Sequence, residues 1–214
     1  MSERVDGRRV RGEATRRAVI EATLQLASTD GLEGVSLSRV ASAAGMSKSG
    51  LFAHFGSKEE LQLAVLRAAR ERLEAAVEPA YEARKGIVRL HALMDEWLGF
   101  LAGGAYEGGD PLLSAATDQA ARPGPVRDLA AETGAWWLGE LRAQAERALE
   151  RGELRTGGDA ARLAWELHAY GLAYDWDRRL TGADPAQARA AVEERLEGAA
   201  TGKGRKRLAG AGAR

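Results

Sequence analysis

The 214-residue chain has no cysteine, only five prolines and no apolar run near the ~18 residues that a membrane-spanning helix needs. The absence of cysteine excludes disulfides, a thiolate nucleophile and a cysteine-ligated zinc site. The N-terminal segment also lacks the apolar core of a secretory signal. We therefore expect a cytoplasmic protein that does not enter a membrane. The net charge of zero, from 31 basic and 31 acidic side chains, argues against a uniformly basic surface but allows a local basic patch.

Between the prolines, the dominant residues are alanine, leucine, glutamate and arginine, which all favour helices. No alternating pattern bounded by turn residues indicates a strand. Helices are predicted where apolar residues recur at helical spacing or a capping residue marks a start. They cover residues 15–28, 37–44, 47–54, 57–77, 87–101, 125–151, 159–180 and 184–200, with a further start at Asp110–Pro111. The sequence predicts an all-α protein.

The most informative stretch runs from Ser36 to Leu61 and holds two short helices joined by a tight turn. Ser36 and Ser47 are candidate N-caps, and Gly45 provides the break between the helices. This arrangement is typical of a helix-turn-helix unit, whose second helix enters the major groove of DNA. The apolar residues expected to pack the two helices together are Val40, Ala43, Met46, Leu51 and Phe55.

The second helix of this unit is expected to present small or polar side chains outward. They are Ser47, Lys48, Ser49, Gly50 and His54, together with the aromatic Phe52. Small side chains let a helix approach bases and phosphates closely, and lysine and hydroxyl groups supply donors. The N–H groups at a helix start can also hold a phosphate. The pattern indicates double-stranded DNA as a partner.

Residues 15–66 resemble the DNA-binding domain of the TetR (tetracycline-repressor-like) family of regulators. The matching positions are Arg16, Gly31, Val35–Leu37, Val40–Ala41, Ala44–Ser47, Gly50–Phe52, His54–Phe55, Ser57–Lys58 and Leu61. One position differs: the family usually has a tyrosine, whose hydroxyl bonds a phosphate, where this chain has Phe52. The resemblance implies a three-helix helix-turn-helix head on a larger helical body that binds a ligand and dimerises.

The resemblance also implies roles for individual residues. Lys48, Ser49 and Phe52 would contact DNA from the recognition helix, and His54 and Lys58 would hold phosphates. Ser36 and Thr15 would do the same at two helix starts. The alternative for both lysines is a solvated side chain without a DNA contact.

The basic N-terminal segment is expected to be a disordered arm. Its Arg8, Arg9 and Arg11 could follow the minor groove, as homeodomain arms do. The alternative is that these arginines only increase solubility.

All five tryptophans lie beyond residue 90. Five residues fall on helix faces expected to point inward and form a candidate ligand-binding wall: Met94, Trp97, Trp137, Trp165 and His168. Apolar walls with a few polar groups are typical of ligand cavities between helices. The alternative is that these faces are only core and dimer interface, because aromatic residues supply much of the burial energy of helical domains. The helix over 159–180 is apolar nearly all round, which favours a subunit interface as well as a core.

The sequence offers no arrangement typical of an enzyme. The glycine-rich stretch 99–109 lacks the spacing of a phosphate-binding loop, and no histidine pair has the spacing of a helical metal site. No nucleophile has a positioned base. We therefore expect no catalytic residue, no metal ligand and no cofactor.

The sequence thus predicts a ligand-responsive transcription regulator, most simply a repressor. It would bind an inverted-repeat (palindromic) operator as a homodimer and be released by a small apolar or aromatic effector. The expected division is a basic arm over 1–12, the head over 13–56, a connecting helix over 57–78, the body over 79–200 and a disordered basic tail over 201–214. The alternatives are a small-molecule-binding or partner-sequestering helical protein with a vestigial head, supported by Phe52 and the neutral charge, and an enzyme that uses the aromatic cavity.

Overall fold

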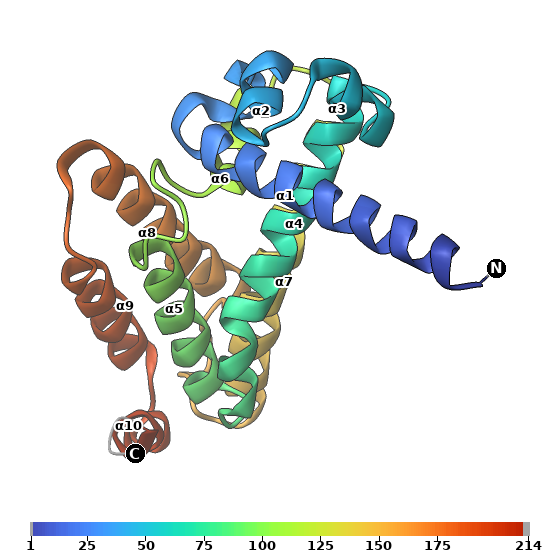
Figure 1. The fold of residues 1–214 in the computed structure, drawn as a ribbon. Helices are drawn as coiled ribbons and strands as arrows, with labels where there is room; N and C mark the ends of the chain where they lie inside the picture. Colours follow the sequence, from blue (N-terminus) through green and yellow to red (C-terminus); the bar gives the residue numbers. More distant parts are fainter. Residues whose placement is uncertain (1, 212–214) are drawn as a thin grey trace. The chain divides into compact units, whose positions relative to one another are not determined.

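The computed structural model describes residues 2–211, except for the side chains of residues 2–6 and 8. Within this range the regular structure is helical, apart from an isolated bridge between Leu154 and Ala200. The all-α prediction is confirmed. The elements are α1 (Ser2–Gly34), α2 (Leu37–Ala43), α3 (Lys48–His54), α4 (Lys58–Val77), the 3-10 helix η1 (Glu78–Glu82), α5 (Ile87–Ala102), α6 (Pro111–Gln119), α7 (Pro125–Glu150), α8 (Ala160–Thr181), α9 (Ala186–Ala199) and α10 (Gly202–Ala211) (Figure 1). None of the described helices is long and apolar enough to cross a membrane.

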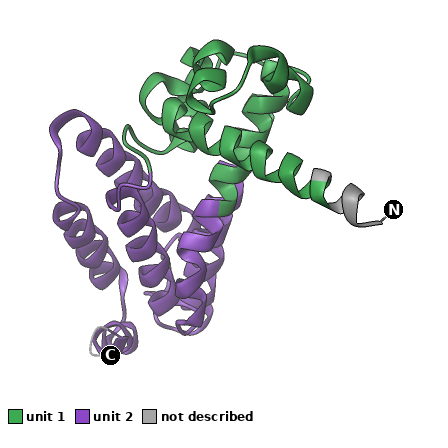
Figure 2. Ribbon diagram, in the orientation of Figure 1, with its two compact units in different colours: residues 1–71, 106–131 green, residues 72–105, 132–214 purple. Residues whose placement is uncertain are grey.

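The chain forms two compact units (Figure 2). The N-terminal unit comprises residues 1–71 and 106–131, and the C-terminal unit comprises residues 72–105 and 132–214. Helices α4 and α7 therefore each contribute residues to both units. The sequence-based division placed residues 106–131 in the body, but this segment clusters with the helix-turn-helix.

The segment 106–131 joins the N-terminal unit because it packs closely on the end of α1. The Gly108 N–H donates to the Ser28 hydroxyl at 3.1 Å, and a Cβ on Gly108 would lie 2.2 Å from the Ser28 carbonyl oxygen. Leu112 and Ala115 of α6 are buried. Gly31 interrupts the helical geometry of α1 with φ 72°. A Cβ at Gly31 would lie 2.6 Å from a carboxylate oxygen of Asp118 in α6. Only glycine adopts this φ without steric cost, and it also leaves room for α6.

The helix-turn-helix forms as its capping residues predict. The Ser36 hydroxyl accepts a hydrogen bond from Arg39 N at 3.3 Å, and the Ser47 hydroxyl accepts one from Gly50 N at 3.1 Å. Gly45 takes φ 65° in the turn between α2 and α3. The apolar residues Val40, Leu51 and Phe55 are almost fully buried, which fixes α2 and α3 against α1. Ala43 is exposed and Met46 only half-buried, so these two contribute less to that core than expected.

The expectation of a disordered arm over residues 1–12 is wrong for the described residues, because α1 extends back to Ser2. The segment contains no proline and has four arginines, which favour a helix. Arg9 and Glu13 form an ion pair at 3.4 Å with helical i,i+4 spacing. The side chain of Arg8 lies outside the described residues.

The expectation of a disordered tail over 201–214 is also wrong as far as residue 211. Helix α10 forms from Gly202 and is fastened to the loop that follows α7. Thr201 N donates to the Glu153 carbonyl at 2.9 Å, and a Cβ on Gly204 would lie 2.1 Å from the same oxygen. This close approach requires glycine. Residues 212–214 lie outside the described range.

The C-terminal unit is centred on α5, which packs against α8, α9 and α10. Seven residues of α5 are buried: Ile87, Leu90, Leu93, Met94, Trp97, Leu98 and Leu101. The start of α5 is capped from outside the helix, since Ile87 N donates to the buried Glu153 carboxylate at 3.0 Å.

Helix α8 has two different apolar faces. Leu163, Leu167 and Gly171 are buried, whereas Trp165, Leu172, Trp176 and Leu180 are exposed.

Candidate nucleic-acid interface and aromatic cluster

Helix α3 turns one face to the core and the other to solvent. Leu51 and Phe55 are each 1% exposed, whereas Lys48, Ser49 and Phe52 lie on the exposed face, with Phe52 41% exposed. The Ser47 and Ser49 hydroxyl oxygens lie 3.0 Å apart at the start of this face. Gly50 is half-buried next to the Ser47 hydroxyl, where a Cβ would have a contact of only 3.3 Å. The exposed face of α3 therefore carries a cation, hydroxyl groups and an aromatic ring, and the opposite face is buried in the core through Leu51 and Phe55.

The end of α3 is held to α1 by Arg16. Its Nη1 donates to the His54 carbonyl oxygen at 2.7 Å, and its guanidinium lies 4.2 Å from the centroid of the Phe55 ring. Cations stabilise helix C-termini, where carbonyl groups have no partner within the helix. Arg16 therefore positions α3. From the sequence, Arg16 was identified only as a position that matches the family, and its contact with the end of α3 was not predicted. The His54 side chain is half-buried, so part of it is accessible to solvent.

Lys58, at the start of α4, is held by Glu33 at the end of α1. Its Nζ donates to the Glu33 carbonyl oxygen at 2.8 Å and lies 3.6 Å from the Glu33 carboxylate. The carboxylate also accepts from Gln62 Nε2 at 3.1 Å and from Gln119 Nε2 at 3.4 Å, and lies 3.2 Å from Arg122 Nη1. This group, which we name the Glu33 hub, joins α1, the start of α4 and the end of α6. Sequence reasoning missed it because its members are far apart in the chain.

The hub stabilises the charged form of Glu33. The hydrogen bond from Gln62 lowers the pKa of the Glu33 carboxyl most, and the charges of Lys58 and Arg122 and the bond from Gln119 lower it further, against a smaller opposing effect of burial. Lys58 consequently carries its charge beside a carboxylate, and any phosphate that binds Lys58 competes with Glu33.

Two predicted phosphate contacts at helix starts have different surroundings. Ser36 caps α2 and is exposed. Thr15 is not at a helix start, because α1 begins at Ser2, and its hydroxyl donates to the Arg11 carbonyl at 2.9 Å within the helix. The backbone N–H of Thr15 is therefore not a free anion-binding group. Arg9 and Arg11 are exposed on α1 and do not form an extended arm.

In the C-terminal unit, three of the predicted ligand-binding residues form one cluster. The Trp97 ring lies parallel to the His168 ring at a centroid distance of 5.4 Å and is tilted by 59° against Trp137 at 5.1 Å. Met94 is fully buried on the same helix as Trp97. Trp165 does not join them, because it is 61% exposed on the outward face of α8. We name Trp97, Trp137 and His168 the aromatic cluster.

Gly171 of α8 allows Trp97 to approach the helix backbone. A Cβ at this position would lie 2.0 Å from the Trp97 ring. Because the Trp97 ring already packs against both other rings, a molecule that enters between them must displace at least one ring. Such a displacement changes how α5, α7 and α8 pack within the C-terminal unit.

The aromatic cluster contains two buried polar atoms that find no hydrogen-bond partner among the described residues, Trp137 Nε1 and His168 Nδ1. A buried polar group without a partner costs about 1–3 kcal/mol. Burial lowers the pKa of His168, so this ring is neutral at neutral pH. The cluster therefore suits an uncharged ring system that offers a hydrogen-bond acceptor to the Trp137 N–H.

The side chains that the structure describes include no group of three or more histidine, aspartate or glutamate residues that could hold a metal ion. Lys48, Lys58 and the hydroxyl groups of Ser47 and Ser49 lie around α3 and the start of α4 in one unit, and the aromatic cluster lies in the other unit. A helix-turn-helix with an exposed recognition helix and a separate helical unit defines a DNA-binding regulator.

Comparisons with known proteins agree with this class. Residues 19–65 match the family described as bacterial regulatory proteins, tetR family, and residues 86–193 match the tetracyclin repressor-like C-terminal domain. The chain belongs to the TetR family and is a DNA-binding transcriptional regulator rather than an enzyme. Among curated proteins, no sequence matches it.

Solved structures with low sequence identity share the fold. A TetR transcriptional regulator from Chloroflexus aurantiacus is 24% identical with a TM-score of 0.78, covering 87% of this chain and 94% of its own. A TetR-family regulator from Agrobacterium tumefaciens is 19% identical with a TM-score of 0.76, covering 89% of this chain and 100% of its own. AibR, in complex with isovaleryl coenzyme A and operator DNA, is 21% identical with a TM-score of 0.71, covering 84% of this chain and 96% of its own.

Proposed function

We propose that this regulator is a cytoplasmic repressor that binds an inverted-repeat operator as a homodimer and is released by a small apolar or aromatic effector. The observation that carries the proposal is the exposed face of α3, where Lys48, Ser49 and Phe52 lie over the buried Leu51 and Phe55. A rigid helix with small and cationic side chains outward is suited to the major groove.

Within this proposal, Lys48 and Ser49 read base edges and Phe52 packs against the DNA backbone. Ser36, Ser47, Gly50 and His54 border the same face and contact phosphates. Lys58 makes a phosphate contact in exchange for part of its interaction with Glu33. Thr15 is the weakest of the proposed contacts, because its hydroxyl already donates within α1.

The proposed homodimer rests on the exposed apolar face of α8. Trp165, Leu172, Trp176 and Leu180 recur at helical spacing and are between 39% and 66% exposed. A contiguous exposed apolar surface of this kind marks an interaction site, and the commonest solution for a soluble protein is a two-fold dimer. A two-fold dimer carries two recognition helices at a fixed separation, which matches two inverted half-sites.

The proposed effector site is the aromatic cluster, with Met94 beside it. Its unpartnered Trp137 N–H and its neutral His168 favour an uncharged planar effector that carries an acceptor. The structure of AibR with both isovaleryl coenzyme A and operator DNA supports the idea that one chain of this fold serves both ligands.

The effector acts by shifting populations between two packings of the helices. Helices α4 and α7 both have residues in each unit, so a repacked C-terminal unit can change the N-terminal one through the chain itself. The Glu33 hub would carry such a change from the start of α4 to α1 and α6. An effector shifts this equilibrium only by its difference in affinity for the two states.

Selection of binding sites from a random duplex-DNA pool at two salt concentrations tests the proposal. Enrichment of an inverted repeat that is lost steeply with salt is expected, because phosphate contacts release counterions. The enriched duplex then serves as the probe for aromatic effectors. If no sequence is enriched at low salt, either DNA binding requires a corepressor or the head is vestigial. In the second case, a protein that binds or sequesters a small molecule becomes the better description.

A further inference from the structure

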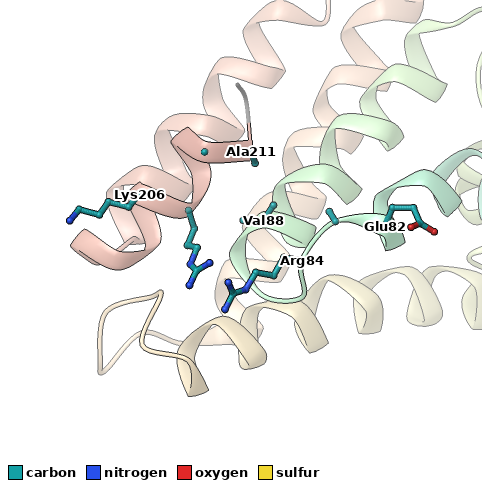
Figure 3. Close-up of a pocket in the computed structure, with 8 residues that line it drawn as sticks. Glu82, Arg84, Val88, Lys206 and Ala211 are labelled. Atoms are coloured by element: carbon teal, nitrogen blue, oxygen red, sulfur yellow. The ribbon is translucent and has the colours of Figure 1, made fainter. Parts of the chain in front are cut away.

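A pocket of about 560 Å³ lies in the C-terminal unit, between α10 and the segment that links η1 to α5. Its lining includes Glu82, Arg84, Val88, Lys206, Arg207 and Ala211 (Figure 3). Neither the proposed DNA contacts nor the aromatic cluster includes any of these residues. The matched C-terminal family domain ends at residue 193, so α10 lies outside that match.

The α10 wall of the pocket is firmly built. Gly204 packs on the Glu153 carbonyl, and two cations fasten the helix by donating to backbone oxygens. Lys203 Nζ donates to the Arg151 carbonyl at 2.6 Å, and Arg205 Nη1 donates to the Ala200 carbonyl at 3.0 Å. Each of these charges thus has a structural role, and α10 is held in place without the residues that line the pocket.

The cations that line the pocket have no such role. Among the described residues, no hydrogen bond or ion pair engages the side chains of Arg84, Lys206 or Arg207. Glu82 is the acidic residue of the lining, and in Figure 3 its carboxylate points away from Arg84. The same view shows Lys206 extending away from Arg84. The lining therefore has an excess of positive charge, contributed by two segments far apart in the sequence.

We propose that this pocket binds a small phosphorylated molecule, with Arg84 and Arg207 as its principal phosphate ligands. Guanidinium groups present planar donors that match phosphate oxygens in pairs. Cations on two walls favour two or more linked phosphates over a single one. Val88 and Ala211 provide an apolar surface for the remainder of the molecule. A hollow of this size favours a small molecule over the backbone of a DNA duplex.

Isothermal titration calorimetry with pyrophosphate, at constant ionic strength, tests the proposal on the full chain. We expect saturable binding of one pyrophosphate per chain. The double variant Arg84→Gln/Arg207→Gln should bind about tenfold more weakly or worse, because charge-assisted hydrogen bonds are lost. Arg84→Lys keeps the charge but not the paired donors, and should fall between the two.

Arg67→Gln is the matched control for the single variant Arg84→Gln, because each removes one arginine charge from an exposed position, and Arg67 lies on α4 in the other unit. It should bind pyrophosphate as the unaltered chain does. Circular dichroism and the melting temperature verify that each variant is folded, and the single variant Arg84→Gln, in an exposed loop, replaces the double one if that fails to fold.

Several results would overturn the proposal. The first is the absence of saturable pyrophosphate binding to the unaltered chain. The second is a loss of pyrophosphate affinity in Arg67→Gln as large as that in Arg84→Gln. The third is an unchanged pyrophosphate affinity in folded Arg84→Gln. A weaker interaction of the double variant with duplex DNA, without pyrophosphate binding to the unaltered chain, would make the surface a DNA contact instead. The proposal does not rest on the proposed repressor function, since operator selection and pyrophosphate binding are measured separately.

Discussion

Lys48 and Lys58 have the same charge but different surroundings in the N-terminal unit. Lys48 is exposed at the start of α3, and no other described residue pairs with it. Lys58 donates to the Glu33 carbonyl and lies beside its carboxylate. The two residues should therefore affect DNA binding in different ways, which separate measurements can resolve.

Lys48→Ala should change the preference for one base pair in each half-site. If Lys48 donates to a base edge, discrimination at that position falls by about 1–3 kcal/mol. Competition binding against single-base variants of the selected operator measures this. A uniform loss across all sequences would instead make Lys48 a backbone contact.

Lys58→Ala should weaken binding to all sequences alike and reduce the slope of log affinity against log salt by about 1. The reason is that one phosphate contact disappears together with the counterion that it releases. Binding measured at several salt concentrations gives the slope. An unchanged slope would mean that Glu33 retains Lys58 in the complex.

At the scale of elements, two contacts determine how helices meet within each unit. In the C-terminal unit, Gly171 of α8 admits the Trp97 ring of α5. In the N-terminal unit, the Glu33 hub joins α1, α4 and α6. One contact depends on steric fit, whereas the other depends on charge and should respond to pH.

Gly171→Ala should destabilise the fold by about 1–3 kcal/mol, because the new methyl group overlaps the Trp97 ring and forces the helices apart. Chemical denaturation measures the change. Gly198→Ala is the matched control, since nothing lies within 4 Å of a Cβ there, and it should be neutral or stabilising by up to about 1 kcal/mol. Equal effects of the two substitutions would contradict a specific Gly171–Trp97 contact.

Glu33→Gln should make the free energy of unfolding depend less on pH in the acidic range. The pKa of Glu33 is lower in the folded state than in the unfolded state, so its charged form stabilises the fold above the unfolded pKa. This contribution is lost as the pH falls through the folded pKa. Denaturation curves from neutral to acidic pH should therefore show a smaller decline for the variant. Glu59→Gln, an exposed neighbour at the start of α4, should leave the profile unchanged.

At the scale of the whole molecule, the proposed operator recognition requires the proposed homodimer. The exposed residues of α8 are the largest apolar side chains left uncovered in the C-terminal unit. Two copies that cover this face would place two heads on one operator, whereas a single copy would read one half-site.

Trp176→Glu should convert the proposed dimer to a monomer, because a two-fold interface receives the unpaired charge twice. Operator affinity should fall accordingly, while the affinity for a single half-site persists. Sedimentation or light scattering gives the mass in solution. Ala190→Glu, on the exposed surface of α9, adds the same charge and should leave the mass unchanged. A dimer that survives Trp176→Glu would place the interface elsewhere.

Local signals in the sequence determined the helix-turn-helix and the helices between it and the last segment, but not the helical segments at the two ends of the chain. Ser36 and Ser47 cap α2 and α3, and Gly45 makes the turn, through contacts that reach only three or four residues along the chain. Interactions of this range depend on neighbouring residues and can be read without knowledge of the fold. Leu51 and Phe55 were predicted as core because they share one face of a short helix.

The tertiary structure alone decided what distant segments do together. Glu33 meets Arg122, and Glu153 caps α5, only because packing brings these residues side by side. Trp165 faces outward because α8 is apolar on two faces, and periodicity identifies residues that share a face but not which face turns to the core. Helix α10 forms because Gly204 fits against a backbone oxygen that the sequence does not reveal. Contacts within one helical turn follow from the sequence, whereas contacts between segments follow from the fold.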